Sequence, residues 1–260
     1  RKIFNFLRGM SEGIHISLKA EEIFRIGLPG GGFPVTNSLI LSTFALLVIA
    51  GIALALRRRI SLVPGKIQNA LESIIDAVLG LMDNVLGSRQ KSEKYLPLVA
   101  TIFLFILTSN WLGILPGIGS IVVRGEETAP LLRSPASDLN FTLALAIITV
   151  FTVNVLGIIA IGFVSHAKKF LNFQSPIAFF VGILEFISEL AKLISFSFRL
   201  FGNVFAGEIL LTIVAFLVPY VVPLPFLFLE IFVGFIQAFV FAMLALVFTA
   251  MATVEHEESH

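Results

Sequence analysis

A single arginine lies in the middle of one of the most apolar parts of this sequence. Arg199 belongs to the stretch SFSFRLFGNVFAGE, residues 195–208, where its immediate neighbours are phenylalanine and leucine. A guanidinium stays protonated in any protein environment, and a charge at the centre of a membrane helix costs at least about 2.5–3.5 kcal/mol. Two roles would justify that cost: an ion pair that joins two helices, or a fixed charge on an ion path across a membrane.

Further polar residues occur in the two apolar segments around Arg199. They are Glu185, Glu189, Lys192, Asn203, Glu208, Glu230 and Gln237. At about 100° per residue, three of them share the helix face of Arg199 to within about 40°, namely Glu185, Lys192 and Asn203. Glu208 falls about 180° away, on the opposite face. The pattern fits an ion path, and the alternative is local ion pairing, because Glu189 comes three residues before Lys192.

The other apolar segments contain asparagines and small residues. Asn110 and Asn154 each lie inside such a segment, where interhelical hydrogen bonding is the ordinary role of an asparagine. The last segment carries a line of small residues that allows close helix packing, formed by Gly234, Ala238, Ala242 and Ala245.

The composition is that of a membrane protein. Hydrophobic residues make up 57% of the 260 residues and charged residues 13%, whereas a soluble domain carries about a quarter charged residues. The net charge of +1 argues against a nucleic-acid partner. The absence of cysteine excludes disulfides and cysteine-ligated metals. We expect an all-α, polytopic integral membrane protein.

The hydropathy pattern divides the chain into a lead-in, a membrane domain and a tail. We expect an extramembrane lead-in at 1–37, one membrane domain at 38–254 and a polar tail at 255–260. Within the membrane domain, the predicted spans are 38–56, 97–116, 140–163, about 174–219 and about 223–253. The segment SHAKKF after the third span reads as a short basic loop.

The fourth span is too long for an upright helix. About 45 helical residues would extend roughly 65 Å, against a hydrocarbon core of about 30 Å. The segment must therefore break or lie steeply tilted, and a strongly tilted hairpin of the last two segments satisfies its length.

Residues 67–86 form a predicted amphipathic helix outside the spans. Apolar residues recur there at helical spacing, and Glu72, Asp76 and Asp83 occupy another face. The helix could lie on the membrane surface, against a partner, or as a solvated connector on its own protein. The cations around this segment and at Lys168 and Lys169 predict an external N-terminus and a cytoplasmic C-terminus.

Four segments together resemble subunit a of the F-type ATP synthase. They are RLFGNVFAGE, LVPGKIQNALESII, FILTSNWLGILP and FIQAFVFAMLALVF, and the resemblance covers roughly residues 20 to 254. It implies a stator subunit with two offset half-channels that carry protons to and from a rotating c-ring. It implies no cofactor or metal and no catalysis by this subunit alone, which does not bind nucleotide.

The resemblance also assigns residues. Arg199 matches the family's essential arginine, Asn203 and Glu208 match polar positions of the half-channels, and Gln237 matches the glutamine near the arginine. Glu185 matches an acidic position toward the exit side, and Asn110 matches a second-span asparagine. The chain departs from the family at three positions. It has Gly113 and Ile118 where some relatives carry acids, and Glu230 where some relatives carry histidine. Glu230 can still bind a proton.

The partners implied by the resemblance are the c-ring, the peripheral-stalk b subunits, the rest of the ATP synthase and the lipid bilayer, in a bacterial plasma (inner) membrane. A secondary ion-coupled transporter is the alternative, but the inverted repeats typical of that class are absent from the sequence. An intramembrane protease would need catalytic residues inside spans, whereas the four histidines fall outside them and read as surface residues. A purely structural anchor would not need Arg199.

Overall fold

A computed structural model describes residues 20–28, 31–58, 61, 65–115, 122–124, 128–170, 175–218 and 221–253. Within these residues the helices are α2 (Asn37–Arg57), α3 (Lys66–Leu86), α4 (Arg89–Ile114), α5 (Leu139–Ile161), α6 (Phe163–Phe170), α7 (Pro176–Leu217) and α8 (Pro223–Thr253). Five of them, all except α3 and α6, are long and apolar enough to cross a membrane. The predicted all-α membrane fold is confirmed, and so is the number of long apolar helices.

Two small antiparallel hairpins accompany the helices. One pairs β1 (Glu22–Leu28) with β2 (Gly31–Thr36), and the other pairs β3 (Val122–Arg124) with β4 (Thr128–Pro130). The short 3-10 helix η2 (Pro135–Ser137) follows β4 and is buried among α2, α4, α5 and α7. The connection before α5 is therefore partly inside the protein.

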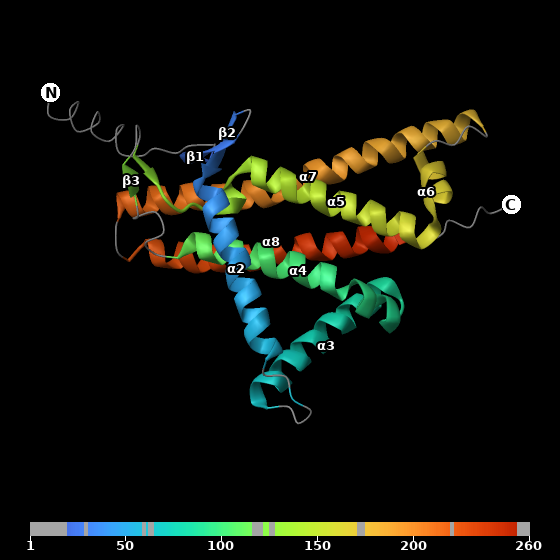
Figure 1. Cartoon of the computed structure of the whole chain (residues 1–260), viewed down its shortest axis with the longest axis horizontal. Helices are drawn as coiled ribbons and strands as arrows, with labels where there is room; N and C mark the ends of the chain where they lie inside the picture. Colours follow the sequence, from blue (N-terminus) through green and yellow to red (C-terminus); the bar gives the residue numbers. More distant parts are fainter. Residues whose placement is uncertain are drawn as a thin grey trace.

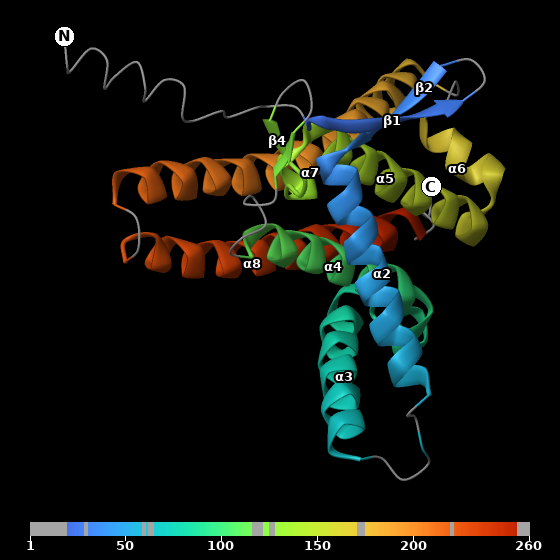
Figure 2. The ribbon, with the colours of Figure 1, turned by 60° about the vertical axis from the view of Figure 1, so that its left-hand side comes forward.

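Four helices run alongside one another. In Figure 1, α7 and α8 form a long antiparallel hairpin, and α4 and α5 pack along it. The first long helix, α2, crosses this group steeply, and α3 projects from it beside the C-terminal end of α2, as the turned view in Figure 2 shows. A membrane normal that suits α2 leaves the α7–α8 hairpin strongly tilted.

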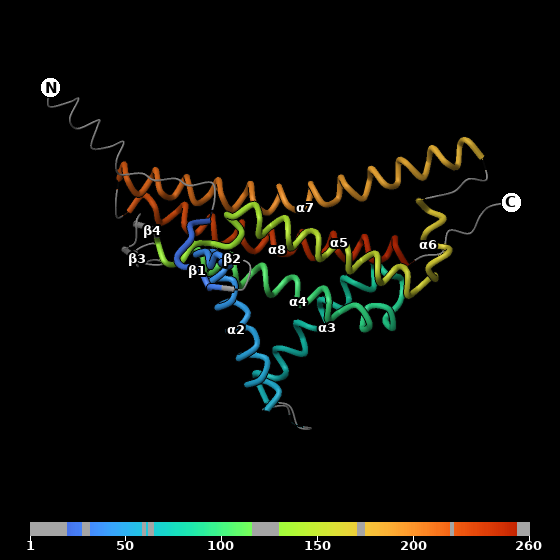
Figure 3. The backbone as a smooth tube through the Cα atoms, turned by 45° about the horizontal axis from the view of Figure 1, so that its top comes forward, coloured from blue at the N-terminus to red at the C-terminus, as the bar shows by residue number. Residues whose placement is uncertain are grey.

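The fourth predicted span is a single unbroken helix. α7 contains 42 residues, which corresponds to about 63 Å at 1.5 Å per residue. Figure 3 shows that α7 bends gradually along its length instead of breaking. Of the two options that its length allows, a break or a tilt, the structure excludes the break, because α7 is continuous. Its length then requires a tilt in the membrane.

Local sequence explains the helix ends. The hydroxyls of Thr36, Ser88 and Ser175 accept hydrogen bonds from the first turns of α2, α4 and α7, and such N-caps satisfy amide groups that lack helical partners. Gly87 and Gly162 adopt φ values of 72° and 86° after α3 and α5, a conformation that glycine adopts without strain.

The small residues of α8 pack as predicted. Gly234, Ala238, Ala242 and Ala245 are all buried. Asn110 of α4 donates a hydrogen bond from Nδ2 to the carbonyl oxygen of Gly234 at 3.1 Å. Close packing and an interhelical asparagine bond therefore join α4 to α8.

Two sequence expectations need correction. The predicted basic loop SHAKKF lies within a helix, α6, and His166 in it is buried instead of lying on the surface. Eight residues are too few for a helical period to be recognised in sequence, and the burial depends on packing against α5.

The predicted lead-in contains the β1–β2 hairpin. Residues 1–19, Ile118 and the tail 255–260 lie outside the described residues.

The contact between α6 and α7 depends on a glycine. A Cβ added at Gly182 of α7 would collide with the backbone carbonyl of Phe170 at the end of α6. We predict that Gly182→Ala lowers the free energy of unfolding by about 1–3 kcal/mol, the usual cost of overpacking. Thermal unfolding in detergent measures it. The control is Gly51→Ala in α2, where a Cβ meets nothing within 4 Å; equal melting temperatures for the two variants would contradict this account.

Candidate ion path

Arg199 lies on an exposed face of α7. Its neighbours Phe196, Ser197 and Leu200 are buried against other helices, whereas Arg199 and Asn203 point outward. Its Nη2 donates a hydrogen bond to Ser195 Oγ at 3.1 Å. Within the described part of the chain, no carboxylate forms an ion pair with it. The guanidinium is therefore available to a group from outside this chain.

The register of the hairpin brings Gln237 to the level of Arg199. The ring of Phe196 lies 4.4 Å from that of Phe241 between centroids, and Gly207 faces Glu230. Because α7 and α8 are antiparallel, Arg199, between Phe196 and Gly207, lies level with the turn of α8 that begins at Gln237. Arg199 and Gln237, both assigned to the ion path by the sequence resemblance, thus lie at the same level of the α7–α8 hairpin.

Glu230 and Glu208 meet near the turn of the hairpin. Glu230 is 7% exposed, and its carboxylate lies so close to Gly207 that a Cβ there would overlap it. Glu208 is the next residue of α7. The predicted shared location of the two carboxylates is consistent with this geometry, and Gly207 is the residue that makes room for it.

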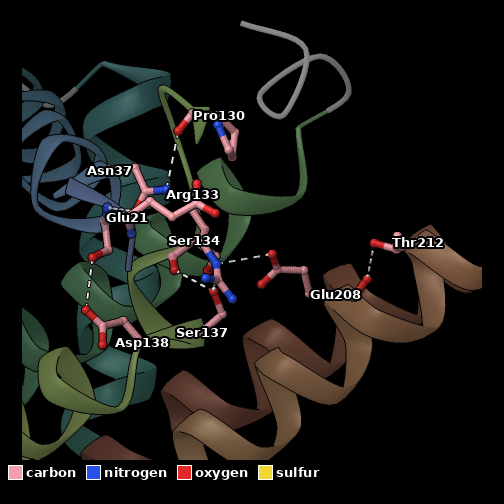
Figure 4. Close-up of polar contacts among 10 residues, drawn as sticks. Glu21, Asn37, Pro130, Arg133, Ser134, Ser137, Asp138, Glu208 and Thr212 are labelled. Carbon is pink, nitrogen blue, oxygen red and sulfur yellow. Dashed lines mark hydrogen bonds and ion pairs between the residues drawn. The ribbon is translucent and has the colours of Figure 1, made fainter. Parts of the chain in front are cut away.

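Glu208 also has a basic partner that the sequence did not suggest. Arg133, which precedes η2, points its side chain at α7, and its Nε lies 3.3 Å from Glu208 Oε1 (Figure 4). The same Nε donates to Ser137 Oγ at 3.1 Å. The Arg133 side chain is only 7% exposed, whereas that of Glu208 is 39% exposed.

Several polar atoms at this end are buried without a hydrogen-bond partner among the described residues. They are Glu208 Oε2, Ser134 Oγ, Ser109 Oγ and Asn110 Oδ1. Buried polar atoms are nearly always hydrogen-bonded, and water fills that role where the site is polar. We call Asn110, Arg133, Ser134, Glu208 and Glu230 the turn-end cluster; its composition suits a hydrated site.

A second polar cluster lies at the other end of α7. Asn154 of α5 donates from Nδ2 to Glu189 Oε2 at 3.2 Å. Its Oδ1 lies 3.0 Å from His166 Nε2, which donates the hydrogen bond because an amide oxygen can only accept. Glu189 forms an ion pair with Lys192. These four residues, with the half-buried Glu185, form what we call the α6-end cluster.

The ion pair between Glu189 and Lys192 confirms local ion pairing, the alternative to an ion path, for these two residues. Glu189 and Lys192 pair with each other, three positions apart, and the ammonium of Lys192 also lies 4.9 Å from the centre of the Phe248 ring. Glu185 is close enough for its charge to act on His166. Burial lowers the pKa of His166 below its ordinary 6.5, Lys169 lowers it further, and Glu189 and Glu185 oppose the shift.

The structure thus separates the predicted residues into three places along α7. Glu208 and Glu230 lie toward the hairpin turn, Arg199, Asn203 and Gln237 lie in the middle, and Glu185 lies toward α6. Asn110, bonded to Gly234, lies between the first two groups. The sequence missed Arg133, Gly207 and His166. Only Gly207 had a usable signal, because a glycine inside a helix often marks close packing.

Comparisons with known proteins agree on one family. The family described as ATP synthase A chain matches residues 39–250. The ATP synthase subunit a of Campylobacter jejuni is 38% identical over 217 residues, 82% of this chain and 88% of that protein. The subunit a of Mycobacterium marinum is 37% identical over 235 residues, 88% and 91% of the two chains. That of Aliarcobacter butzleri is 35% identical over 223 residues, 85% and 91%.

The lowered pKa of His166 predicts a pH-dependent contact. A protonated His166 is disfavoured in the folded state, so its contribution to stability is complete above pH 6.5 and decreases as the pH falls below that value. Hydrogen exchange of the α6 amides, corrected for intrinsic rates, should accelerate in this range. The variant His166→Gln keeps a donor for Asn154 and should lose the pH dependence; an unchanged profile in this variant would assign the effect to another group.

Proposed function

Because this chain belongs to the ATP synthase A chain family, we propose that Arg199 is the fixed charge that separates two half-channels for protons beside a rotor ring. The chain is the proton-translocating stator subunit of the F0 sector, a non-catalytic membrane subunit of the ATP synthase. A secondary transporter is not favoured.

The observation that carries this proposal is that no carboxylate of the described residues forms an ion pair with the guanidinium of Arg199. It lies on a face of α7 that also exposes Ser195, Asn203 and Ala206, all within about 40° of it on the helix. A cation exposed on a membrane helix costs several kcal/mol in lipid, so it requires a counter-charge from a neighbouring protein. A buried carboxylate on each c subunit meets this requirement, since a nearby guanidinium favours the ionised carboxylate and lipid favours the neutral one.

The two clusters supply the half-channels. At 1.5 Å per residue, Glu185 and Glu208 are separated by about 34 Å along α7, and Arg199 lies between them. A proton that enters through the turn-end cluster, where Glu208 and Glu230 lie, would reach the ring on one side of Arg199. It would leave through the α6-end cluster after nearly a full turn, because the guanidinium repels a cation that tries to pass directly.

The sides of the membrane follow from the charge distribution. Cations lie at the C-terminal end of α2, at the N-terminal end of α4 and in α6. We infer from them that these ends lie on the cytoplasmic side. The turn-end cluster then faces outward, with an external N-terminus and a cytoplasmic C-terminus in a bacterial plasma membrane. The c-ring and the b subunits are the partners we expect within the complex.

Replacement of the arginine should uncouple the complex. In Arg199→Ala we expect ATP-driven proton pumping and ATP synthesis to be abolished and a passive proton leak through the membrane sector to appear, because nothing then separates the half-channels. Fluorescence quenching in membrane vesicles measures both. Arg57→Ala, which removes an exposed arginine at the end of α2, is the control. Normal pumping by Arg199→Ala in an assembled complex would overturn the proposal.

Water access tests the turn-end cluster. The chain has no cysteine, so Glu208→Cys and Glu230→Cys each introduce a unique thiol. We expect both to react with a membrane-impermeant thiol reagent from the outer side, Glu208→Cys faster because its side chain is more exposed. Ala242→Cys, in the core, is the unreactive control. Failure of both thiols to react from either side would show that this cluster is not hydrated.

A further inference from the structure

Arg133 is the only cation of the described residues that forms an ion pair with a carboxylate of the turn-end cluster. It comes from the connection between α4 and α5, and it reaches Glu208 across the interior of the protein (Figure 4). Its side chain is more than nine-tenths buried. A buried charge is stabilised only by good partners, and removal of one partner leaves the other uncompensated. This ion pair is therefore a specific feature and not a surface contact.

The backbone around Arg133 is held on several sides. Asn37 of α2 donates from Nδ2 to the carbonyl oxygen of Pro130 at 3.3 Å. Ser38 donates to Asp138 Oδ2 at 3.0 Å, and Ser137 donates to the carbonyl oxygen of Ser134 at 2.9 Å. These contacts fix both ends of the segment, so the position of the guanidinium is set before it meets Glu208.

A glycine of α4 permits this position. A Cβ added at Gly113 would lie 2.5 Å from Ser134 Cβ and 3.0 Å from Ser134 Cα. Because those distances are far below van der Waals contact, any larger residue at 113 would push the segment away from α4. The glycine is thus required for the approach that delivers Arg133.

We propose that Arg133 is a positioning residue for proton transfer at Glu208. It holds Oε1 at 3.3 Å and leaves Oε2, which is buried and has no hydrogen-bond partner among the described residues, as the oxygen that takes up and releases the proton. The proton binds to Oε2 from water and leaves from the same atom, so Arg133 itself exchanges no proton. The inference rests on the proposed function, because it requires that Glu208 lies on the proton path.

The experiment separates this role from a merely structural one by a double-variant comparison in the whole ATP synthase. ATP-driven proton pumping is measured in membrane vesicles for Arg133→Met, Arg133→Lys, Glu208→Gln and the double variant Arg133→Met/Glu208→Gln. Arg89→Met removes an ion-paired arginine outside both clusters and is the matched control. Rates are normalised to the amount of assembled complex.

We expect Arg133→Met to pump several-fold more slowly than the parent protein and Arg133→Lys to recover most of the rate, because lysine restores the charge. In the Glu208→Gln background, Arg133→Met should cause no further loss, since residues that act through one another are not additive. If the Glu208→Gln rate is too low to measure, Glu208→Asp replaces it as the background. Its shorter side chain draws the carboxylate away from Arg133, so Arg133→Met should then cause a smaller loss than in the parent protein.

Two results would overturn the inference. One is an unchanged rate in Arg133→Met. The other is an equal loss from Arg133→Met with and without Glu208, which would make Arg133 a support of the loop only. A parental rate in Glu208→Gln is a different result: it would remove Glu208 from the proton path and with it that part of the proposed function.

Discussion

The architecture depends on how charges inside a membrane protein are balanced. Arg133 is paired with Glu208 and Lys192 with Glu189, both within the chain. Arg199 has only the hydroxyl of Ser195 among the described residues. An intramembrane guanidinium without a carboxylate is stable only if another molecule supplies one. In the proposed function, the imbalance therefore identifies the face of α7 that meets the rotor, and the two balanced pairs mark the interior on either side of it.

The long helix α7 fixes the positions of these charges relative to one another. Because α7 is continuous over 42 residues, the turn-end cluster, Arg199 and the α6-end cluster have fixed spacings along a single axis. The bonds Asn110 to Gly234, Thr142 to Ser197 and Asn154 to Glu189 hold neighbouring helices in register with it. A broken helix would let the two clusters shift relative to Arg199. The tilt of the hairpin follows from the same length, since about 63 Å cannot stand upright in about 30 Å of hydrocarbon.

The sequence predicted the parts of this arrangement that depend on composition and period. The five apolar helices, the amphipathic α3 and the polar residues of α7 and α8 could all be found from hydropathy and spacing. Arg133 could not, because it lies in a polar connection where one more cation carries no periodic signal. His166 was wrongly expected at the surface, since its burial depends on Asn154 and Gly157 of another helix. Arg133 and His166 depend on contacts between segments that are distant in sequence, and such contacts could not be predicted from one sequence alone.

Two close approaches shape the surroundings of the turn-end cluster. Position 113 of α4 is glycine, and the space that a side chain would need is occupied by Ser134. Position 230 of α8 is a glutamate that lies against Gly207 of α7. An acid at 113 would both displace the segment of Arg133 and compete with Glu208 for its guanidinium. With glycine there, Arg133 can reach Glu208. Among the described residues, Glu230 forms no ion pair and is a second carboxylate beside that pair. In the proposed function, this second carboxylate can carry an exchangeable proton.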